Sequence, residues 1–130
     1  RTLWTYEEGG YTAVTLEGDL VFYASSNGSL VGLDKNSGQV RWKRSLDKTI
    51  ATQPIFYRGL LIYGEWTGLI RAVDARNGQD VGHYATGRGV ASTPVIDAKK
   101  NVGYFTSVDA NIYALNLGWI RKGEAWEWEK

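Results

Sequence analysis

"GLDKNSGQVRW", residues 32–42, fits two different structures. Asp34, Asn36 and Gly38 stand at alternate positions, where a calcium-binding loop carries its oxygen ligands and its glycine. The same eleven residues also fit a tight turn followed by a short strand that contains Trp42. The first interpretation predicts a metal site, and the second predicts a structural turn that binds no ligand. The rest of the chain has to distinguish them.

A repeat of about 40 residues runs through the chain. Three sets of residues recur at intervals of 40 to 42 positions: Val14, Pro54 and Pro94; Gly28, Gly68 and Ala110; Asp34, Asp74 and Asn116. The first set precedes an apolar run in each copy, and the second set lies in a turn between two such runs. A repeat of this length indicates stacked supersecondary units, and the fold has to be read one repeat at a time.

The sequence predicts an all-β fold. Runs such as LVFYAS, LLIYGE and VGYFTS are β-branched or aromatic and are bounded by turn residues, and Asn27-Gly28 is a strong hairpin signal. A 40-residue unit of four short strands is typical of a propeller blade. We predict β-propeller blades of four antiparallel strands in one domain, 1–130, with about three blades and one orphan outer strand. The predicted units are 1–8 (outer strand of a preceding blade), 9–46, 47–86 and 87–130.

Composition excludes several functions. Lys and Arg number 15 against 14 Asp and Glu, a net charge of +1, so bulk charge gives no sign of a nucleic-acid partner. Cysteine is absent, which excludes disulfides, zinc–cysteine sites and thiol catalysis. No apolar run reaches the roughly 18 residues that span a bilayer. The chain begins at Arg1 and contains no Met, which fits a processed or excised piece.

Gly32, Asp34, Ser37-Gly38 and Trp42 resemble the tryptophan-docking motif of the quinoprotein-type (PQQ-like) β-propeller repeat family. That motif has a small residue, Asp, Thr-Gly and Trp over eleven positions. The resemblance implies that Trp42 stacks between neighbouring blades and that Asp34 and Gly38 shape the turn that receives it. Trp4 lies 38 positions before Trp42, close to the same phase.

The other two copies of the motif are degenerate. The second keeps Asp74 and Gly78 but has Gly82 in place of the Trp, so we expect a weaker interface there, or one filled by His83 or Tyr84. The third keeps Ala114 and Asn116 and then departs, and Gly123 followed by Trp126 or Trp128 can restore the turn and the strand.

Three blades do not close a propeller, because closed rings have at least about four. Three explanations remain open: a fragment of a longer propeller, completion by another chain (a copy of itself or a different protein), and an open arc with covered ends. The first two are favoured. The expected partner is therefore a protein, or a second copy that completes the propeller, and not a nucleic acid.

The motif residues favour a turn over a calcium site. The twelfth position counted from Asp34 is Ser45, where a calcium loop has a bidentate Glu, and no acidic residue stands at 37–44. The resemblance also raises a quinone-dependent dehydrogenase, in which many members use a vicinal disulfide and an acidic base beside calcium. A cysteine-free chain of this length does not supply those groups, so we expect no catalytic residues, no PQQ and no metal.

Trp66 is the one exposed-loop candidate for a contact with a partner or ligand. It lies in the predicted hairpin "GEWTGLI", with Arg71 and Arg88 near it in the repeat. The alternative, which we favour, is that Trp66 docks between blades in place of the Trp that is absent at 82. The resulting hypothesis is a non-catalytic binding or assembly scaffold, extracytoplasmic by resemblance; a PQQ dehydrogenase fragment and a ligand-sensing ectodomain remain alternatives.

Overall fold

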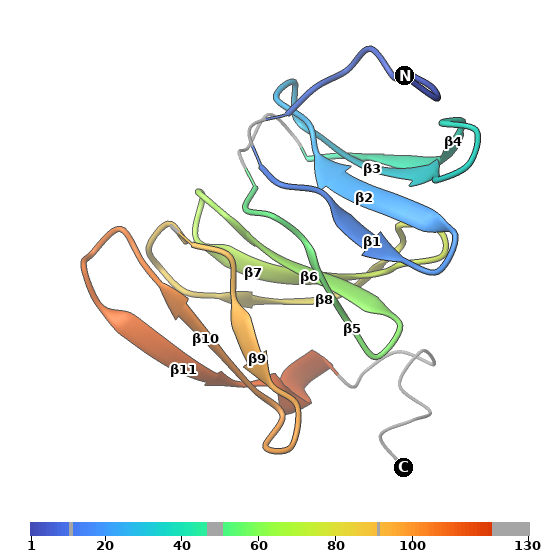
Figure 1. Cartoon of the computed structure of the whole chain (residues 1–130). Helices are drawn as coiled ribbons and strands as arrows, with labels where there is room; N and C mark the ends of the chain where they lie inside the picture. The colour runs from blue at the N-terminus through green and yellow to red at the C-terminus, as the bar shows by residue number, and fades with distance from the viewer. Residues whose placement is uncertain (11, 47–50, 91, 121–130) are drawn as a thin grey trace.

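The computed structural model describes residues 1–10, 12–46, 51–90 and 92–120. These form three antiparallel sheets, which Figure 1 shows as stacked blades. The first contains β1 (Thr15–Glu17), β2 (Leu20–Ala24), β3 (Ser29–Asp34) and β4 (Val40–Ser45). The second contains β5 (Ile55–Tyr57), β6 (Leu60–Glu65), β7 (Leu69–Asp74) and β8 (Asp80–Ala85). The third contains β9 (Val95–Asp97), β10 (Val102–Thr106) and β11 (Ile112–Asn116), followed by the 3₁₀ helix η1 (Leu117–Ile120). The all-β blade prediction is confirmed.

The strands of each blade follow one another in the sheet, so every connection is a short antiparallel turn. The turn between the second and third strands needs a left-handed backbone in all three blades: φ is +89° at Gly28, +104° at Gly68 and +69° at Ala110. Glycine adopts this conformation without the steric cost that Ala110 bears. Blades 1 and 2 also share a register shift before Leu33 and Val73, where the fourth strand begins.

The core lies between blades rather than within them, because a sheet buries apolar side chains on both faces when a neighbour covers each. The middle blade shows this best: all six residues of β6 are buried. One cluster joins blade 1 to blade 2 and includes Phe22, Leu30 and Trp42. A second cluster joins blade 2 to blade 3 and includes Ile62 and Phe105. The described structure is therefore a one-dimensional stack in which each blade depends on its neighbours.

The N-terminal end of the stack differs from the prediction, and the C-terminal end leaves the prediction untested. Residues 1–8, predicted as an outer strand, form none: the described segment 1–10 makes no ladder and lies on the outer face of blade 1, where Trp4 and Tyr6 pack on a buried cluster that includes Tyr23. A strand needs a ladder of backbone hydrogen bonds, and among the described residues the segment has a single such contact, from the N–H of Ser26 to the Gly9 carbonyl at 2.9 Å. At the other end, the predicted turn at Gly123 and strand with Trp126 or Trp128 lie outside the described residues.

Candidate functional site

The turn at 34–38 is held together by its own carboxylate. Asp34 Oδ1 accepts hydrogen bonds from the backbone N–H groups of Asn36 at 2.8 Å and Ser37 at 3.0 Å. The bonds from Ser37 and Asn36 are the main reason that the pKa of Asp34 lies below its usual range. Gly38, at φ +77°, donates its N–H to the Asp34 carbonyl at 2.8 Å. These contacts are those of a structural turn.

The same bond recurs at the equivalent position of each blade. The Asp74 carboxylate accepts the backbone N–H of Arg76 at 2.8 Å, and the Asn116 side-chain oxygen accepts that of Gly118 at 2.8 Å. Asp74 is also paired with the Arg76 guanidinium, whose hydrogen bond is the largest cause of its lowered pKa. An amide at the third position shows that this bond does not need the negative charge.

Trp4 and Trp42 each dock on the turn of the following blade. Trp42 donates its indole N–H to the carbonyl oxygen of Ala75 at 2.9 Å, and Trp4 donates to that of Lys35 at 2.8 Å. A Cβ added to Gly78 would lie 2.5 Å from the Trp42 ring, and one added to Gly38 would lie 2.5 Å from the Trp4 ring. The expectation that the turn at 34–38 receives Trp42 is therefore wrong: it receives Trp4, and Trp42 crosses to blade 2.

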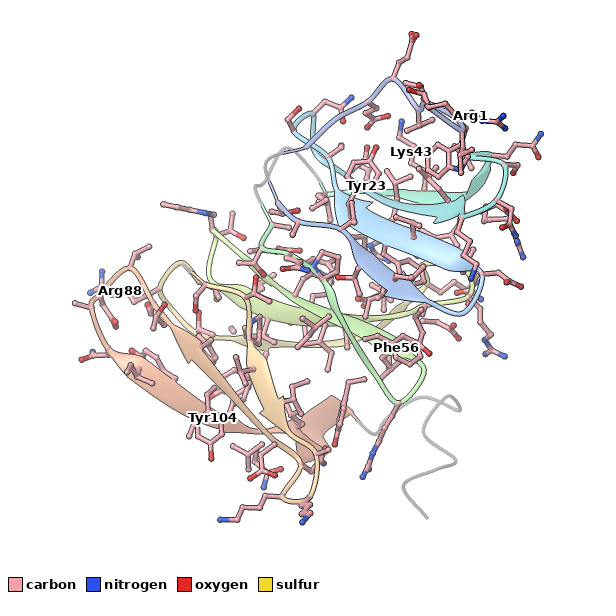
Figure 2. The ribbon with its side chains drawn as sticks, viewed as in Figure 1. Arg1, Tyr23, Lys43, Phe56, Arg88 and Tyr104 are labelled. Atoms are coloured by element: carbon pink, nitrogen blue, oxygen red, sulfur yellow. The ribbon has the colours of Figure 1, made fainter. Side chains whose placement is uncertain are left out.

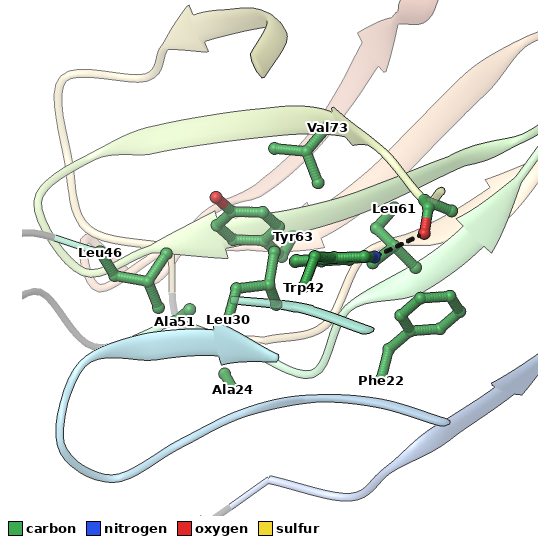
Figure 3. Packing of buried hydrophobic residues seen from close by; sticks show 10 residues of the cluster. Phe22, Ala24, Leu30, Trp42, Leu46, Ala51, Leu61, Tyr63 and Val73 are labelled. Atoms are coloured by element: carbon green, nitrogen blue, oxygen red, sulfur yellow. Dashed lines mark hydrogen bonds between the residues drawn. The ribbon is translucent and has the colours of Figure 1, made fainter. Parts of the chain in front are cut away.

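Trp42 is the centre of the first interface, as Figure 3 shows. Its ring lies 6.0 Å from the ring of Phe22, between side chains of both blades. It also explains Gly32 on the neighbouring strand, because a Cβ there would come within 2.8 Å of the indole. Burial of the indole contributes about 2–3 kcal/mol by area.

At the second interface the small and the large residue have changed places relative to the first interface. Gly82 stands where blade 1 has Trp42, and Leu117 stands where blade 2 has Ala75. Leu117 is buried in the cluster between blades 2 and 3, whereas Ala75 is the small residue at the same position of the first interface. His83 and Tyr84 are exposed, so the prediction that one of them fills this interface is wrong. The large buried side chain at these positions of the second interface belongs to blade 3.

Arg71 belongs to an ion-pair network between blades 1 and 2. Its Nε lies 3.0 Å from Glu65 and its Nη1 lies 3.0 Å from Asp80, while Arg44 lies 3.7 Å from the same Asp80. Arg71 is therefore occupied and is separate from the surface around Trp66. Tyr63 lies beside this network with a fully buried side chain; burial raises its pKa, and its hydroxyl has no hydrogen-bond partner among the described residues.

Trp66 lies at the loop end of the blades. Its side chain is 55% exposed, and it is absent from the buried clusters of the described residues, so it does not dock in the place of a tryptophan at 82. The backbone of Trp66 lies against Gly89, next to the exposed Arg88, which Figure 2 labels at the tip of the loops. Val108, also exposed, donates its N–H to the Gly89 carbonyl at 2.9 Å. We call Trp66, Arg88 and Val108 the loop patch.

A shallow cavity of about 270 Å³ opens next to Trp66. It is lined by residues from the segments that precede the first strand of all three blades: Thr12, Ala13, Ala51, Thr52, Gln53 and Thr93. The Thr52 hydroxyl accepts the N–H of Gly64 at 2.8 Å and so fixes one wall. Among the described residues, no group of three or more His, Cys, Asp or Glu side chains could hold a metal ion, and no helix is long and apolar enough to cross a membrane.

Several residues that shape these sites escaped sequence reasoning. The carbonyls of Lys35 and Ala75 receive the indoles, Leu117 is buried in the second interface, and Tyr63 carries a buried hydroxyl without a hydrogen-bond partner among the described residues. The sequence does contain a signal for this packing. Trp42 is followed one repeat later by the small Ala75, and Gly82 is followed one repeat later by the large Leu117. It becomes visible only when each tryptophan is compared with the following repeat rather than with its own.

Known proteins share this architecture. The crystal structure of BamB from Moraxella catarrhalis superimposes with a TM-score of 0.67 at 27% identity, covering 82% of this chain and 33% of that one. The quinohemoprotein alcohol dehydrogenase from Comamonas testosteroni gives a TM-score of 0.64 at 17% identity, covering 80% and 25%, which shows a common fold alone. In sequence, the outer membrane protein assembly factor BamB of Legionella pneumophila (strain Paris) is 28% identical over 98 residues, 75% of this chain.

The chain corresponds to a minor part of each of these relatives. The aligned part covers between 16% and 26% of the bacterial assembly factors that match it. A family model described as outer membrane protein assembly factor BamB matches residues 1–118, nearly the whole described chain. The chain therefore belongs to the BamB-type family of PQQ-like β-propeller repeats.

Proposed function

We propose that this chain is a non-catalytic, protein-binding scaffold module that acts in outer-membrane protein assembly, outside the cytoplasm. Its family and the named function of its relatives support this proposal. The contacts of its motif residues agree with it, because Asp34, Gly38 and Trp42 are engaged in turns and in the contact between blades. A rigid stack of this kind leaves the loop ends free for recognition.

The observation that carries the proposal is the loop patch. An exposed tryptophan beside an arginine has the composition of an interface hot spot, where an aromatic ring anchors a partner and a guanidinium pairs with a carboxylate. The patch is held by backbone contacts among three successive loops, so its residues are positioned before a partner arrives. The partner is expected to present an apolar side chain with an acidic residue next to it.

Two labelled probes test this function by fluorescence anisotropy. One is an outer-membrane β-barrel protein diluted from urea, and the other is a purified outer-membrane assembly complex that lacks its own BamB. We expect saturable binding to at least one probe, weakened at least about tenfold by Trp66→Ala with Arg88→Ala. Lys99→Ala, at an exposed turn after β9, is the matched control and should bind as the unaltered chain does. Absence of binding to both probes, or equal binding by the patch variant, contradicts the proposal.

An alternative function is that of a PQQ-dependent dehydrogenase, of which this chain would be a fragment. The fold shared with the alcohol dehydrogenase is the reason to test it. Titration with PQQ and calcium separates the two, because saturable binding with a quinone absorbance change favours the enzyme. The scaffold proposal predicts no binding of either. A ligand-sensing ectodomain would instead change its mass when its ligand is added.

A further inference from the structure

The cavity next to Trp66, which we call the loop cavity, differs in chemistry from the loop patch. All seven of the described residues that line it are uncharged, and four of them carry neutral hydrogen-bonding side chains: Thr12, Thr52, Gln53 and Thr93. Its volume of about 270 Å³ lies just below the range of about 300–1,000 Å³ that is usual for small-molecule pockets. We therefore expect it to take one small ring rather than a folded partner or a long chain.

Two polar side chains of the loop cavity are held in place by contacts within the stack. Thr52 is buried, and its hydroxyl accepts the N–H of Gly64 at 2.8 Å, so its own proton remains available to donate. Gln53 Nε2 donates to the Val14 carbonyl and to Thr15 Oγ1, both at 3.2 Å, and its amide oxygen remains available as an acceptor. A ligand that bonds to these two groups meets side chains that are already ordered, which lowers the entropic cost of binding.

A third hydroxyl of the wall departs from the pattern of the repeat. Thr52 and Ser92, which occupy equivalent positions in blades 2 and 3, accept the backbone N–H groups of Gly64 and Thr106 at 2.8 and 2.9 Å. The equivalent residue of blade 1 is Thr12, whose buried hydroxyl has no hydrogen-bond partner among the described residues. A buried polar atom of this kind is normally satisfied by a partner, and a polar molecule in the loop cavity is one that the position allows.

Trp66 adds an aromatic surface to this neutral, hydrogen-bonding wall. It lines the loop cavity and is 55% exposed, so its indole is open to a molecule that enters. A pyranose ring with equatorial hydroxyls matches both features, because its faces present C–H groups to an aromatic ring and its rim carries hydroxyls that donate and accept. An anion would be desolvated without a counter-charge from the described wall, which disfavours phosphate or carboxylate ligands.

We propose that the loop cavity binds a neutral saccharide, one glucose-type ring of which enters the cavity. Trp66 packs on a C–H face of this ring, while Thr52 donates to one of its hydroxyls and Gln53 accepts from another. The inference goes beyond the proposed function, because it uses Trp66 without Arg88 and does not require a protein partner.

Titration of the ¹⁵N-labelled chain with cellotriose and with chitotriose, followed by NMR, tests the site directly. The six tryptophans give six indole N–H signals, and the one lost in Trp66→Phe belongs to Trp66. We expect at least one of the two sugars to shift this signal saturably, with a dissociation constant on the order of 1 mM for one ring in a shallow site. Sorbitol, which has similar hydroxyls but no ring face, should leave the signal in place. An unsaturable shift, or an equal shift with sorbitol, overturns the proposal.

Variants separate this site from the protein-binding function. Ala13→Trp fills the loop cavity from an exposed position, and Trp66→Ala removes the indole; each should weaken saccharide binding at least about tenfold, with an unchanged circular dichroism spectrum. Arg88→Ala should weaken binding of the protein probes and leave saccharide binding unchanged, so either function can fail without the other. Lys99→Ala is the control for both. Saccharide affinity that is unchanged in folded Trp66→Ala, or that falls equally in Arg88→Ala, overturns the proposal.

Discussion

The most direct test of how the blades fit is to replace the large Trp42 by a small residue and the small Ala75 by a large one at the first interface. Trp42→Gly removes the indole and its hydrogen bond to Ala75, and Ala75→Leu adds the side chain that Leu117 supplies at the second interface. The double variant therefore gives the contact between blades 1 and 2 the residue pair found between blades 2 and 3. Its behaviour shows whether residue size at these two positions determines which blades fit together.

The magnitudes follow from the packing. Loss of a buried tryptophan costs roughly 3–5 kcal/mol, and glycine within a strand adds about 0.5–1 kcal/mol. Ala75→Leu alone pushes a larger side chain against the indole and costs about 1–3 kcal/mol. With the indole gone, the same leucine fills the vacated space and restores about 2 kcal/mol. The two substitutions should therefore be coupled by roughly 3 kcal/mol or more, in the direction of mutual rescue.

Urea unfolding followed by far-UV circular dichroism measures this coupling in the unaltered chain, both single variants and the double variant. Dichroism is preferred because Trp42 itself contributes to the fluorescence. If Trp42→Gly leaves no cooperative transition, the return of one in the double variant is the supporting result. Free energies that add within about 0.5 kcal/mol, or a double variant that stays unfolded, refute the reasoning.

Tyr63→Phe should raise the free energy of unfolding or leave it unchanged, because it removes a buried hydroxyl that has no partner among the described residues. Tyr23→Phe should lower the free energy of unfolding by about 1 kcal/mol, because it removes a hydrogen bond to the Glu8 carbonyl. Urea midpoints of the two variants test this difference. Gly78→Ala should be at least about 1 kcal/mol more destabilising than Gly59→Ala in thermal unfolding, since both have positive φ but a docked ring lies 2.5 Å from the new Cβ at Gly78 alone. The pKa of folded Asp74 lies below its ordinary 3.8, so its carboxylate adds stability above that value, and this stability is lost as pH falls through the folded pKa. Asp74→Asn should therefore show a shallower loss of urea midpoint between about pH 5 and pH 2, and an equal slope would contradict this.

The repeat made the blade architecture predictable, because Gly28, Gly68 and Ala110 mark the same left-handed turn in each unit. The direction of docking was not predictable from one motif. Asp34, Gly38 and Trp42 lie within eleven residues and suggest a self-contained unit, yet the indole spans to a carbonyl 33 positions later. Local spacing carries no information about which side of a sheet faces which neighbour.

The loop patch could be predicted only in part from the sequence, for the same reason. Trp66, Arg71 and Arg88 are close in the repeat, but strand alternation sends Arg71 to a partly buried ion pair and leaves Trp66 at the loop end. The preference for Trp66 between blades followed from the vacancy at Gly82. The large side chain buried at that interface is Leu117 of blade 3, at a position that the motif leaves unspecified.

The exchange of sizes at the two interfaces has a consequence for how the repeats can be ordered. A blade that presents Trp42 fits a successor with a small residue at the receiving position, and a blade that presents Gly82 fits a successor with a large one. If blade 2 were deleted, Trp42 would meet Leu117, and the two bulky side chains would compete for one space. Blades with similar backbones are thus not interchangeable, and during folding a blade that pairs with the wrong neighbour loses the fit that its true neighbour provides.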